Sequence, residues 1–144
     1  MLNFNSTIKE EKIFGDIKIA EVEPIIKINL RSKKREFSKK IGKILSILPP
    51  TEANTSSGNE GYNLLWLSPD EWLVYSNNKK QSLKEQIDLE DRLFDEISKL
   101  NQGAVTNVSD HWVMINFKGN KIYDLLSKSC PFNFNEFKRK KGSV

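Results

Sequence analysis

LLWLSPDEWLVYS, spanning Leu64–Ser76, gives the clearest structural signal in the chain. It contains two short runs of aliphatic and aromatic residues, Leu64–Leu67 and Trp72–Tyr75, separated by four residues of the kinds that form turns. Short apolar runs bounded by turn residues are typical of β-strands. The sequence therefore predicts a hairpin, and we expect it either to bury Trp66 and Trp72 or to present one of them to a partner.

The connection between the two runs, Ser68-Pro69-Asp70-Glu71, predicts a type I turn. Pro69 presets φ at the second turn position, and the Ser68 side chain can bond the backbone ahead of it. Asp70 and Glu71 are paired carboxylates, a combination that can serve general acid–base catalysis. At the tip of a hairpin they would be exposed to solvent, where a carboxylate gains little catalytic power. We therefore interpret Pro69, Asp70 and Glu71 as structural or interface residues.

Upstream of the hairpin, the pattern predicts an arm, a strand, a helix and a loop. Residues 1–24 are polar and mixed in character, so we expect a loosely ordered arm that drapes over a partner. Apolar residues alternate in Ile25–Leu30, which predicts a half-buried strand, and recur with helical spacing over residues 37–48, which predicts an amphipathic helix. Pro49-Pro50 ends this helix, and residues 51–61, rich in Ser, Thr, Asn and Gly, predict a mobile loop.

Downstream of the hairpin, the pattern predicts a long helix, two strands and a short helix. The long helix covers residues 83–100 and begins at a capping box, Ser82–Glu85. Residues 105–109 and 112–117 predict a strand pair or one long bent strand, and residues 122–126 predict the short helix. The apolar residues of the long helix that we expect to face the core are Leu83, Ile87, Leu93, Phe94, Ile97 and Leu100.

The predicted elements follow the order β-α-β-β-α-β-β-α, which indicates an α+β fold with helices on one face of a largely antiparallel sheet. We expect a single domain over residues 25–137, preceded by the arm and followed by a basic tail over residues 138–144. The chain has 144 residues. A chain of this length buries roughly 68–70% of its unfolded surface, which is enough for a core of its own.

Charge, hydropathy and cysteine content exclude several classes of protein. The net charge is +4, but basic and acidic residues are interspersed, apart from a cluster at Lys138–Lys141 that we interpret as a solvated terminus. We therefore expect no nucleic-acid binding. No apolar run approaches the ~20 residues of a membrane helix, so we expect no membrane insertion either. The single cysteine, Cys130, and an N-terminus without a signal-peptide pattern predict a cytoplasmic protein.

The residue types of a hydrolase triad occur side by side in Ser109-Asp110-His111. Neighbouring side chains on a strand point to opposite faces, so these three cannot form the hydrogen-bonded chain that a triad requires. We instead expect Ser109 to bond local backbone and Asp110 to mark a strand junction. Both are interpreted as structural or interface residues, and no catalytic residue is predicted.

The remaining candidates for chemistry also favour structural roles. Cys130 precedes Pro131 at a predicted helix end and has no basic neighbour in sequence, so we expect a buried, inert thiol. Gly119 turns the chain, and the spacing of the glycines fits neither a dinucleotide-binding nor a phosphate-binding loop. His111 is the only histidine, so a zinc site of His and Cys ligands would need help from another chain. We predict no cofactor-binding or metal-binding residue in this chain.

Three segments share their order and spacing with the motifs of one known family. The first is Leu64–Ser76, where the family has Leu-Trp-Leu-Gly-Pro-Asp-Glu-Trp-Leu and this chain has Ser68 for the glycine. The second is Val108–Asp110, which leads to a strand and then Gly119. The third is Leu125–Phe134, where the family has Leu-Leu-x-x-Gly-Cys-Pro-Leu-Asp-Leu. Other departures from the family's pattern are Asn107, His111, Trp112, Ser129 and Asn133. Together the segments resemble the gamma subunit of heterotetrameric sarcosine oxidase.

The resemblance extends over residues 25–137 and implies a fold similar to the folate-binding domains of glycine-cleavage T-protein, an aminomethyltransferase. It implies a non-catalytic subunit of a complex that oxidatively demethylates sarcosine to glycine, forming hydrogen peroxide and, with tetrahydrofolate, methylene-tetrahydrofolate. The implied partners are the alpha, beta and delta subunits, with FAD, FMN, NAD and folate in alpha and beta and zinc in delta. Family members continue past the position of Gly142 with a further strand, so either this chain is naturally short or the sequence is truncated before that strand. A missing strand would expose a sheet edge, which invites pairing with another chain.

Two rival functions have weaker support from the sequence. A small folate-binding or aminomethyltransferase-like protein would need an acidic residue to hold the pterin, and Glu60, Asp70 and Asp110 are available. A basic nucleic-acid-binding module would bind with an affinity that falls steeply with salt. Tetrahydrofolate binding by the isolated chain would indicate the first alternative, and salt-dependent binding to DNA or RNA would indicate the second.

Overall fold

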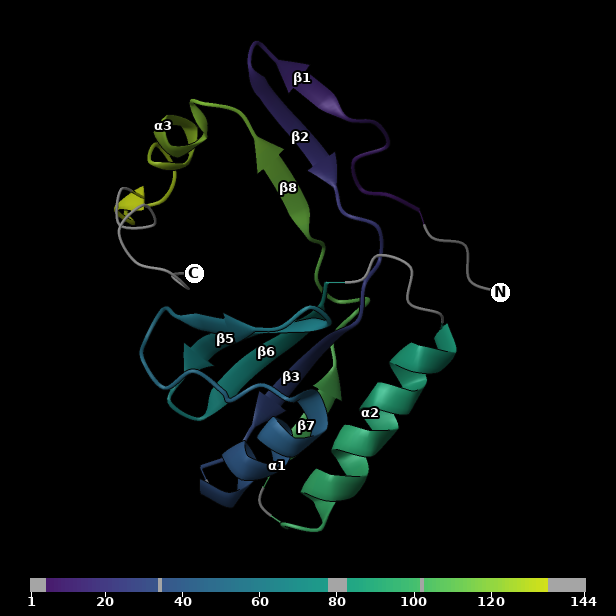
Figure 1. The fold of residues 1–144 in the computed structure, drawn as a ribbon. Helices are drawn as coiled ribbons and strands as arrows, with labels where there is room; N and C mark the ends of the chain where they lie inside the picture. The colour runs from purple at the N-terminus through teal and green to yellow at the C-terminus, as the bar shows by residue number, and fades with distance from the viewer. Residues whose placement is uncertain (1–4, 34, 78–82, 102, 135–144) are drawn as a thin grey trace. The chain divides into compact units, whose positions relative to one another are not determined.

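The computed structural model describes residues 5–33, 35–77, 83–101 and 103–134. They divide into two compact units (Figure 1). Among the described residues, the five-stranded unit is formed by Pro24–His111, and the three-stranded unit combines those up to Glu23 with those from Trp112 to Phe134. The predicted capping residue Ser82 and the predicted basic tail over residues 138–144 lie outside the described residues.

The five-stranded unit contains one antiparallel sheet with the strand order β4-β5-β6-β3-β7. In chain order its elements are β3 (Lys27–Arg31), α1 (Arg35–Leu45), β4 (Ser56–Gly58), β5 (Tyr62–Ser68), β6 (Glu71–Ser76), α2 (Leu83–Ser98) and β7 (Ala104–Asn107). The predicted hairpin is confirmed as β5 and β6, with Trp66 opposite Trp72 and Ser68 opposite Glu71. A register shift between Trp66 and Ser68 brings the chain into the turn.

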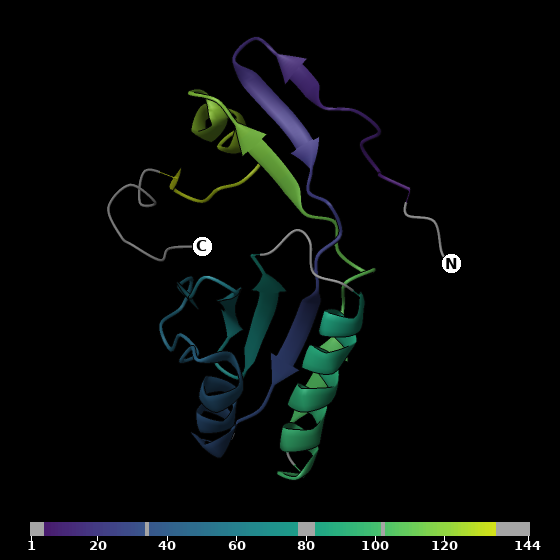
Figure 2. The same cartoon turned by 45° about the vertical axis from the view of Figure 1, so that its right-hand side comes forward.

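A single core fills the space between this sheet and its two helices. Alternation along β3 directs Ile28 and Leu30 to the same face, where they pair with Val74 and Trp72 of β6. The buried helix residues on this core are Phe37, Ile41 and Leu45 of α1 and Leu89, Leu93 and Ile97 of α2. Each fully buried aliphatic or aromatic side chain contributes about 1.5–3 kcal/mol. Both helices therefore cover the same face of the sheet (Figure 2), and the predicted α+β class is confirmed.

Several predicted details of the five-stranded unit are wrong. Helix α1 ends at Leu45 rather than residue 48, because Ser46 adopts a left-handed φ of 57° before Pro49-Pro50 is reached. Ile87 and Phe94 of α2 are 57% and 59% exposed, although both were expected to face the core. Strand β4 lies within residues 51–61, where the composition had predicted only a loop, because its Ser-Ser-Gly sequence carries no apolar alternation.

The three-stranded unit has the strand order β1-β2-β8, and all its pairs are antiparallel. Its elements are β1 (Lys12–Phe14), β2 (Ile17–Glu21), β8 (Ile115–Lys118) and α3 (Ile122–Leu126). The prediction of a loosely ordered arm over residues 1–24 is therefore wrong for Lys12–Glu21. Gly15 and Asp16 form a two-residue turn in which Gly15 adopts a φ of 63°, and such a Gly-Asp pair between apolar runs is itself a hairpin signal.

Strands β7 and β8 belong to different sheets, so the predicted strand pair or long bent strand over residues 105–117 is wrong. Strand β7 pairs with β3, whereas β8 pairs with β2, which lies about a hundred residues earlier in the chain. The division of the chain at Pro24 and His111 was not predicted, since no linker composition marks either position.

Candidate functional site

The predicted residues of the β5–β6 turn gather around one arginine that the sequence analysis missed. The Arg31 guanidinium at the end of β3 lies 3.9 Å from a carboxylate oxygen of Asp70 and 3.9 Å from one of Glu71. The Asn29 side chain also donates to Glu71, at 2.8 Å. Arg31 stands directly opposite Glu71 in the β3–β6 register, a relation that spacing along the chain does not reveal. The two carboxylates thus fasten the hairpin turn to the neighbouring strand.

Asp70 is held more firmly than a carboxylate on an open hairpin tip. The Ser68 hydroxyl donates to it at 2.8 Å, and the backbone N–H of Ser32 donates to its carbonyl at 3.0 Å. The hydrogen bond from Ser68, and then the charge of Arg31, hold the pKa of Asp70 below its ordinary value. The expected exposure of Asp70 and Glu71 is therefore wrong, since their side chains are 24% and 26% exposed. Pro69, between them and Ser68, is exposed.

Trp72 fixes the hairpin to α1 and to the segment that follows it. Its side chain is buried, stacks on Phe37 of α1 with ring centroids 5.9 Å apart, and donates through Nε1 to the Pro50 carbonyl oxygen at 2.9 Å. A buried indole N–H normally requires such a partner. Trp66, across the strand pair, is half-buried. Of the two outcomes expected for these tryptophans, burial therefore applies to Trp72.

The Ser109 side chain bonds the backbone of a distant strand, so the prediction that it bonds local backbone is wrong. Its hydroxyl oxygen accepts from the Lys27 backbone N–H at 2.9 Å, so it extends the pairing of β3 and β7 by one more hydrogen bond. The Lys27 side chain is buried and donates to the Ile25 carbonyl oxygen at 3.3 Å. Burial lowers the pKa of Lys27, an effect that the charge of nearby Asp110 opposes. Asp110 and His111 are themselves exposed.

The other predicted structural residues lie in the three-stranded unit. Gly119 follows β8 with a φ of 140°, and any Cβ there would clash with the Asp16 carbonyl oxygen. Cys130 is half-buried rather than buried, and its N–H donates to the Leu126 carbonyl oxygen at the end of α3. Pro131 follows it and is exposed. Gly119 thus lies at a close approach between two turns, and Cys130 lies just after the turns that follow the end of α3 at Leu126.

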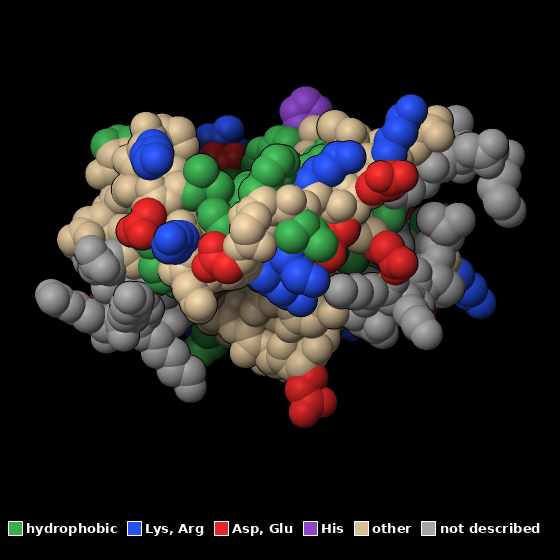
Figure 3. All heavy atoms as spheres, turned by 90° about the horizontal axis from the view of Figure 1, so that it is seen from above, with side chains coloured by type: hydrophobic (Ala, Val, Ile, Leu, Met, Phe, Trp, Pro, Cys, Tyr) green, Lys and Arg blue, Asp and Glu red, His purple; other side chains and the backbone are tan. Residues whose placement is uncertain are grey.

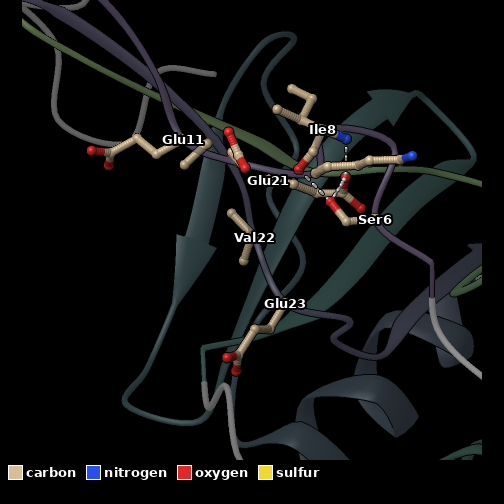
Figure 4. A pocket seen from close by; sticks show the side chains of 9 residues that line it. Ser6, Ile8, Glu11, Glu21, Val22 and Glu23 are labelled. Carbon is tan, nitrogen blue, oxygen red and sulfur yellow. Dashed lines mark hydrogen bonds between the residues drawn. The ribbon is translucent and has the colours of Figure 1, made fainter.

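The three-stranded unit also carries a shallow pocket of about 240 Å³ beside β2. One Glu21 carboxylate oxygen accepts from the Ser6 hydroxyl at 2.7 Å and from the Ile8 N–H at 2.9 Å (Figure 4). The Ile8 N–H, and then the Ser6 hydroxyl, hold the pKa of Glu21 below its ordinary value. Glu21 therefore ties the segment before β1 to the sheet, a role that the sequence analysis missed.

Within the described ranges, no three His, Cys, Asp or Glu side chains are close enough together to hold a metal ion. Nor is any helix in the described part of the chain long and apolar enough to span a membrane. The contacts of Arg31, Ser109 and Glu21 each join two segments that are distant in sequence, whereas the bond from Cys130 to Leu126 is local.

Comparison with known proteins relates the chain to one enzyme complex. The family model for the sarcosine oxidase, gamma subunit family matches residues 35–142. The fold is similar to a chain of heterotetrameric sarcosine oxidase from Corynebacterium sp. U-96, solved in complex with pyrrole 2-carboxylate, with a TM-score of 0.69 and 22% identity. The match covers 81% of this chain and 57% of that one. No curated protein matches the sequence.

Proposed function

The chain belongs to the sarcosine oxidase gamma subunit family, and we propose on this basis that it is a non-catalytic, structural subunit of a sarcosine-oxidase-type complex. The observation that carries the proposal is the family match, which extends over three quarters of the chain, from residue 35 to residue 142. The proposed complex demethylates sarcosine to glycine with formation of hydrogen peroxide and methylene-tetrahydrofolate. This chain would have a structural role in the complex, and the complex would lie in the cytoplasm.

Exposed apolar side chains of the three-stranded unit support a docking role. They account for seven of the eleven large hydrophobic side chains that are exposed among the described residues. These seven are Ile13, Phe14, Trp112, Val113, Ile115, Tyr123 and Leu125. Figure 3 shows hydrophobic side chains gathered between charged ones on one face of the molecule. Apolar surface rimmed by charged residues is typical of protein–protein interfaces.

One face of the small sheet carries most of the apolar side chains of its strands. The β1–β2 and β2–β8 registers place Phe14, Ile17, Ile19, Ile115 and Phe117 on the same side. Phe14 is 64% and Ile115 40% exposed, and the other three are half-buried. We take this face as the surface that meets another subunit.

The partners proposed for this surface are the alpha, beta and delta subunits. FAD, FMN, NAD and folate are assigned to alpha and beta and zinc to delta, so this chain needs no cofactor of its own. The proposal also takes the fold to be similar to the folate-binding domains of T-protein. The antiparallel sheet with both helices on one face agrees with that similarity.

Co-expression tests the proposed function. We expect the tagged chain to co-purify with the three partner subunits in a complex that oxidises sarcosine. A Phe14→Ser/Ile115→Ser double variant should lose most of the association, whereas Ile87→Ser, at a 57% exposed apolar position of α2, should keep it. A wild-type chain that never associates with the flavin-bearing subunits would refute the proposal. Tetrahydrofolate binding by the isolated chain would instead indicate a folate-binding protein.

A further inference from the structure

A groove between α1 and α2 in the five-stranded unit is lined mainly by cations. It has a volume of about 270 Å³, and its lining residues are Lys39, Lys40, Lys43, Ile44, Arg92 and Glu96. Four of these six side chains are positively charged and one is negative. None of them belongs to the predicted site or to the apolar face proposed as the docking surface.

The cations of the groove divide into paired and free ones. Lys40 donates to Glu96 at 2.5 Å, and the same carboxylate accepts from Lys99 at 2.7 Å, so Glu96 is fully engaged. Arg92 donates through one nitrogen to the Ile44 carbonyl oxygen at 3.3 Å, which satisfies a carbonyl of the last turn of α1. The other guanidinium donors form no hydrogen bond or ion pair with a described residue.

Lys39 and Lys43 are the free cations. Both are exposed, and neither forms an ion pair with any residue in the described ranges. Their i, i+4 spacing places them on the same side of α1, where two like charges repel each other. An anion bound between them and Arg92 would relieve that repulsion and gain charge-assisted hydrogen bonds.

The size and the surroundings of the groove decide which anion fits. Its volume is below the roughly 300–1,000 Å³ of pockets for drug-sized ligands, so it suits one or two side chains better than a whole cofactor. Helix α2, which supplies Arg92 and Glu96 to the groove, also carries Glu85, Asp88, Glu90, Asp91 and Asp95 in its described part. A nucleic acid strand is long enough to run from the groove onto this acidic helix, where its phosphates would meet like charges. One or two carboxylates of a peptide can instead lie between Lys39, Lys43 and Arg92 alone.

We propose that the groove lined by Lys39, Lys43 and Arg92 binds an acidic segment of a partner protein through aspartate or glutamate side chains. The proposal rests on the proposed function and deepens it, since it names the chemistry by which a second surface of the chain holds another subunit. Such charge complementarity orients partners and speeds their association.

The test measures binding of the full chain to a fluorescein-labelled octaglutamate peptide by fluorescence anisotropy. We expect Lys39→Gln/Lys43→Gln to raise Kd by about tenfold or more, and raising the salt beyond about 0.15 M to weaken wild-type binding. Lys118→Gln/Lys121→Gln removes the same charge from exposed positions of the three-stranded unit and should change Kd by less than about twofold. Neither variant touches the Lys40–Glu96 pair, so both should fold.

Each outcome decides the proposal. Equal losses in both double variants, or no peptide binding at all, would overturn it. Binding of an oligothymidylate of the same charge that is as tight and depends on the same lysines would assign the groove to nucleic acid and overturn it too. Co-purification of the wild-type chain with its partner subunits tests the proposed function independently of the peptide-binding result. A complex that forms equally well with the groove variant would leave the function standing and reject the groove.

Discussion

Gly119 shows how a single residue sets the geometry of the three-stranded unit. Its φ of 140° brings the backbone against Asp16, in the turn between β1 and β2, and the Asn120 N–H donates to the Asp16 carboxylate at 3.1 Å. A side chain at position 119 would meet backbone, which cannot rotate away as a flexible side chain could. Only glycine fits this approach.

We therefore expect Gly119→Ala to destabilise the small sheet by about 1–3 kcal/mol, through a strained φ and a clash with backbone. Amide hydrogen exchange should accelerate in Ile17–Glu21 and Ile115–Lys118. Gly61→Ala is the control, because a Cβ there meets only the Asn59 side chain, at 3.5 Å. Unchanged exchange in the Gly119→Ala variant would show that the approach to Asp16 is looser than the structure indicates.

Two adjacent apolar residues of helix α2 differ in their burial. Leu93 is 0% exposed and lies in the core, whereas Phe94 is 59% exposed. We expect Leu93→Ala to lower the free energy of unfolding by about 2–5 kcal/mol, because it leaves a cavity. Phe94→Ala should lower it by less than about 0.5 kcal/mol, as at other surface positions. Urea unfolding followed by far-UV circular dichroism measures both, and similar losses would contradict the packing of α2.

The contact between α1 and α2 predicts an acid dependence of stability. Hydrogen bonds from Lys40 and then Lys99 lower the pKa of Glu96 from 4.5 to about 2. Because folding favours the ionised carboxylate, its contribution is fully present above pH 4.5 and is lost as the pH falls towards 2. Glu96→Gln should therefore have a lower free energy of unfolding than wild type at pH 7. This difference in stability should shrink as the pH falls from 4.5 to 2. A difference that stays constant with pH would contradict this assignment.

The two units of the whole molecule differ in how much core they have. Every large hydrophobic residue that is buried among the described residues lies between Ile25 and Ile97, in the five-stranded unit. The described part of the three-stranded unit has no buried residue, and its five-residue helix α3 buries none. A small sheet with little buried apolar surface opens at a lower free energy than a sheet with a packed core.

Native-state hydrogen exchange should therefore divide the molecule along these units. We expect slow exchange in β3 and β6, the strands at the centre of the large sheet, and faster exchange in β1, β2 and β8. Partner subunits bound to the apolar face should slow exchange in the small sheet selectively. Equal protection in both sheets of the free chain would contradict the prediction.

Local patterns were sufficient to predict most elements of the large unit. The Pro69-Asp70 turn between two apolar runs specifies the β5–β6 hairpin, and alternation in Ile25–Leu30 specifies β3. Helical spacing likewise predicted α1 and α2. These patterns depend only on neighbours within a few residues, so they can be recognised in a single sequence without knowledge of the tertiary structure. Motif order along the chain was also sufficient to recognise the sarcosine oxidase gamma subunit family.

Only the tertiary structure decided which distant segments meet. The pairing of β2 with β8, the Arg31 cluster and the bond from Lys27 to Ser109 each join positions dozens of residues apart. Likewise, helical periodicity predicts Phe94 on the apolar side of α2. In the structure the buried strip of α2 is too narrow to include Phe94, which stays exposed to solvent. Strand partners and the limits of a buried face depend on the packing of the whole chain, because hydrogen bonds and hydrophobic burial act across space and leave no local mark in the sequence.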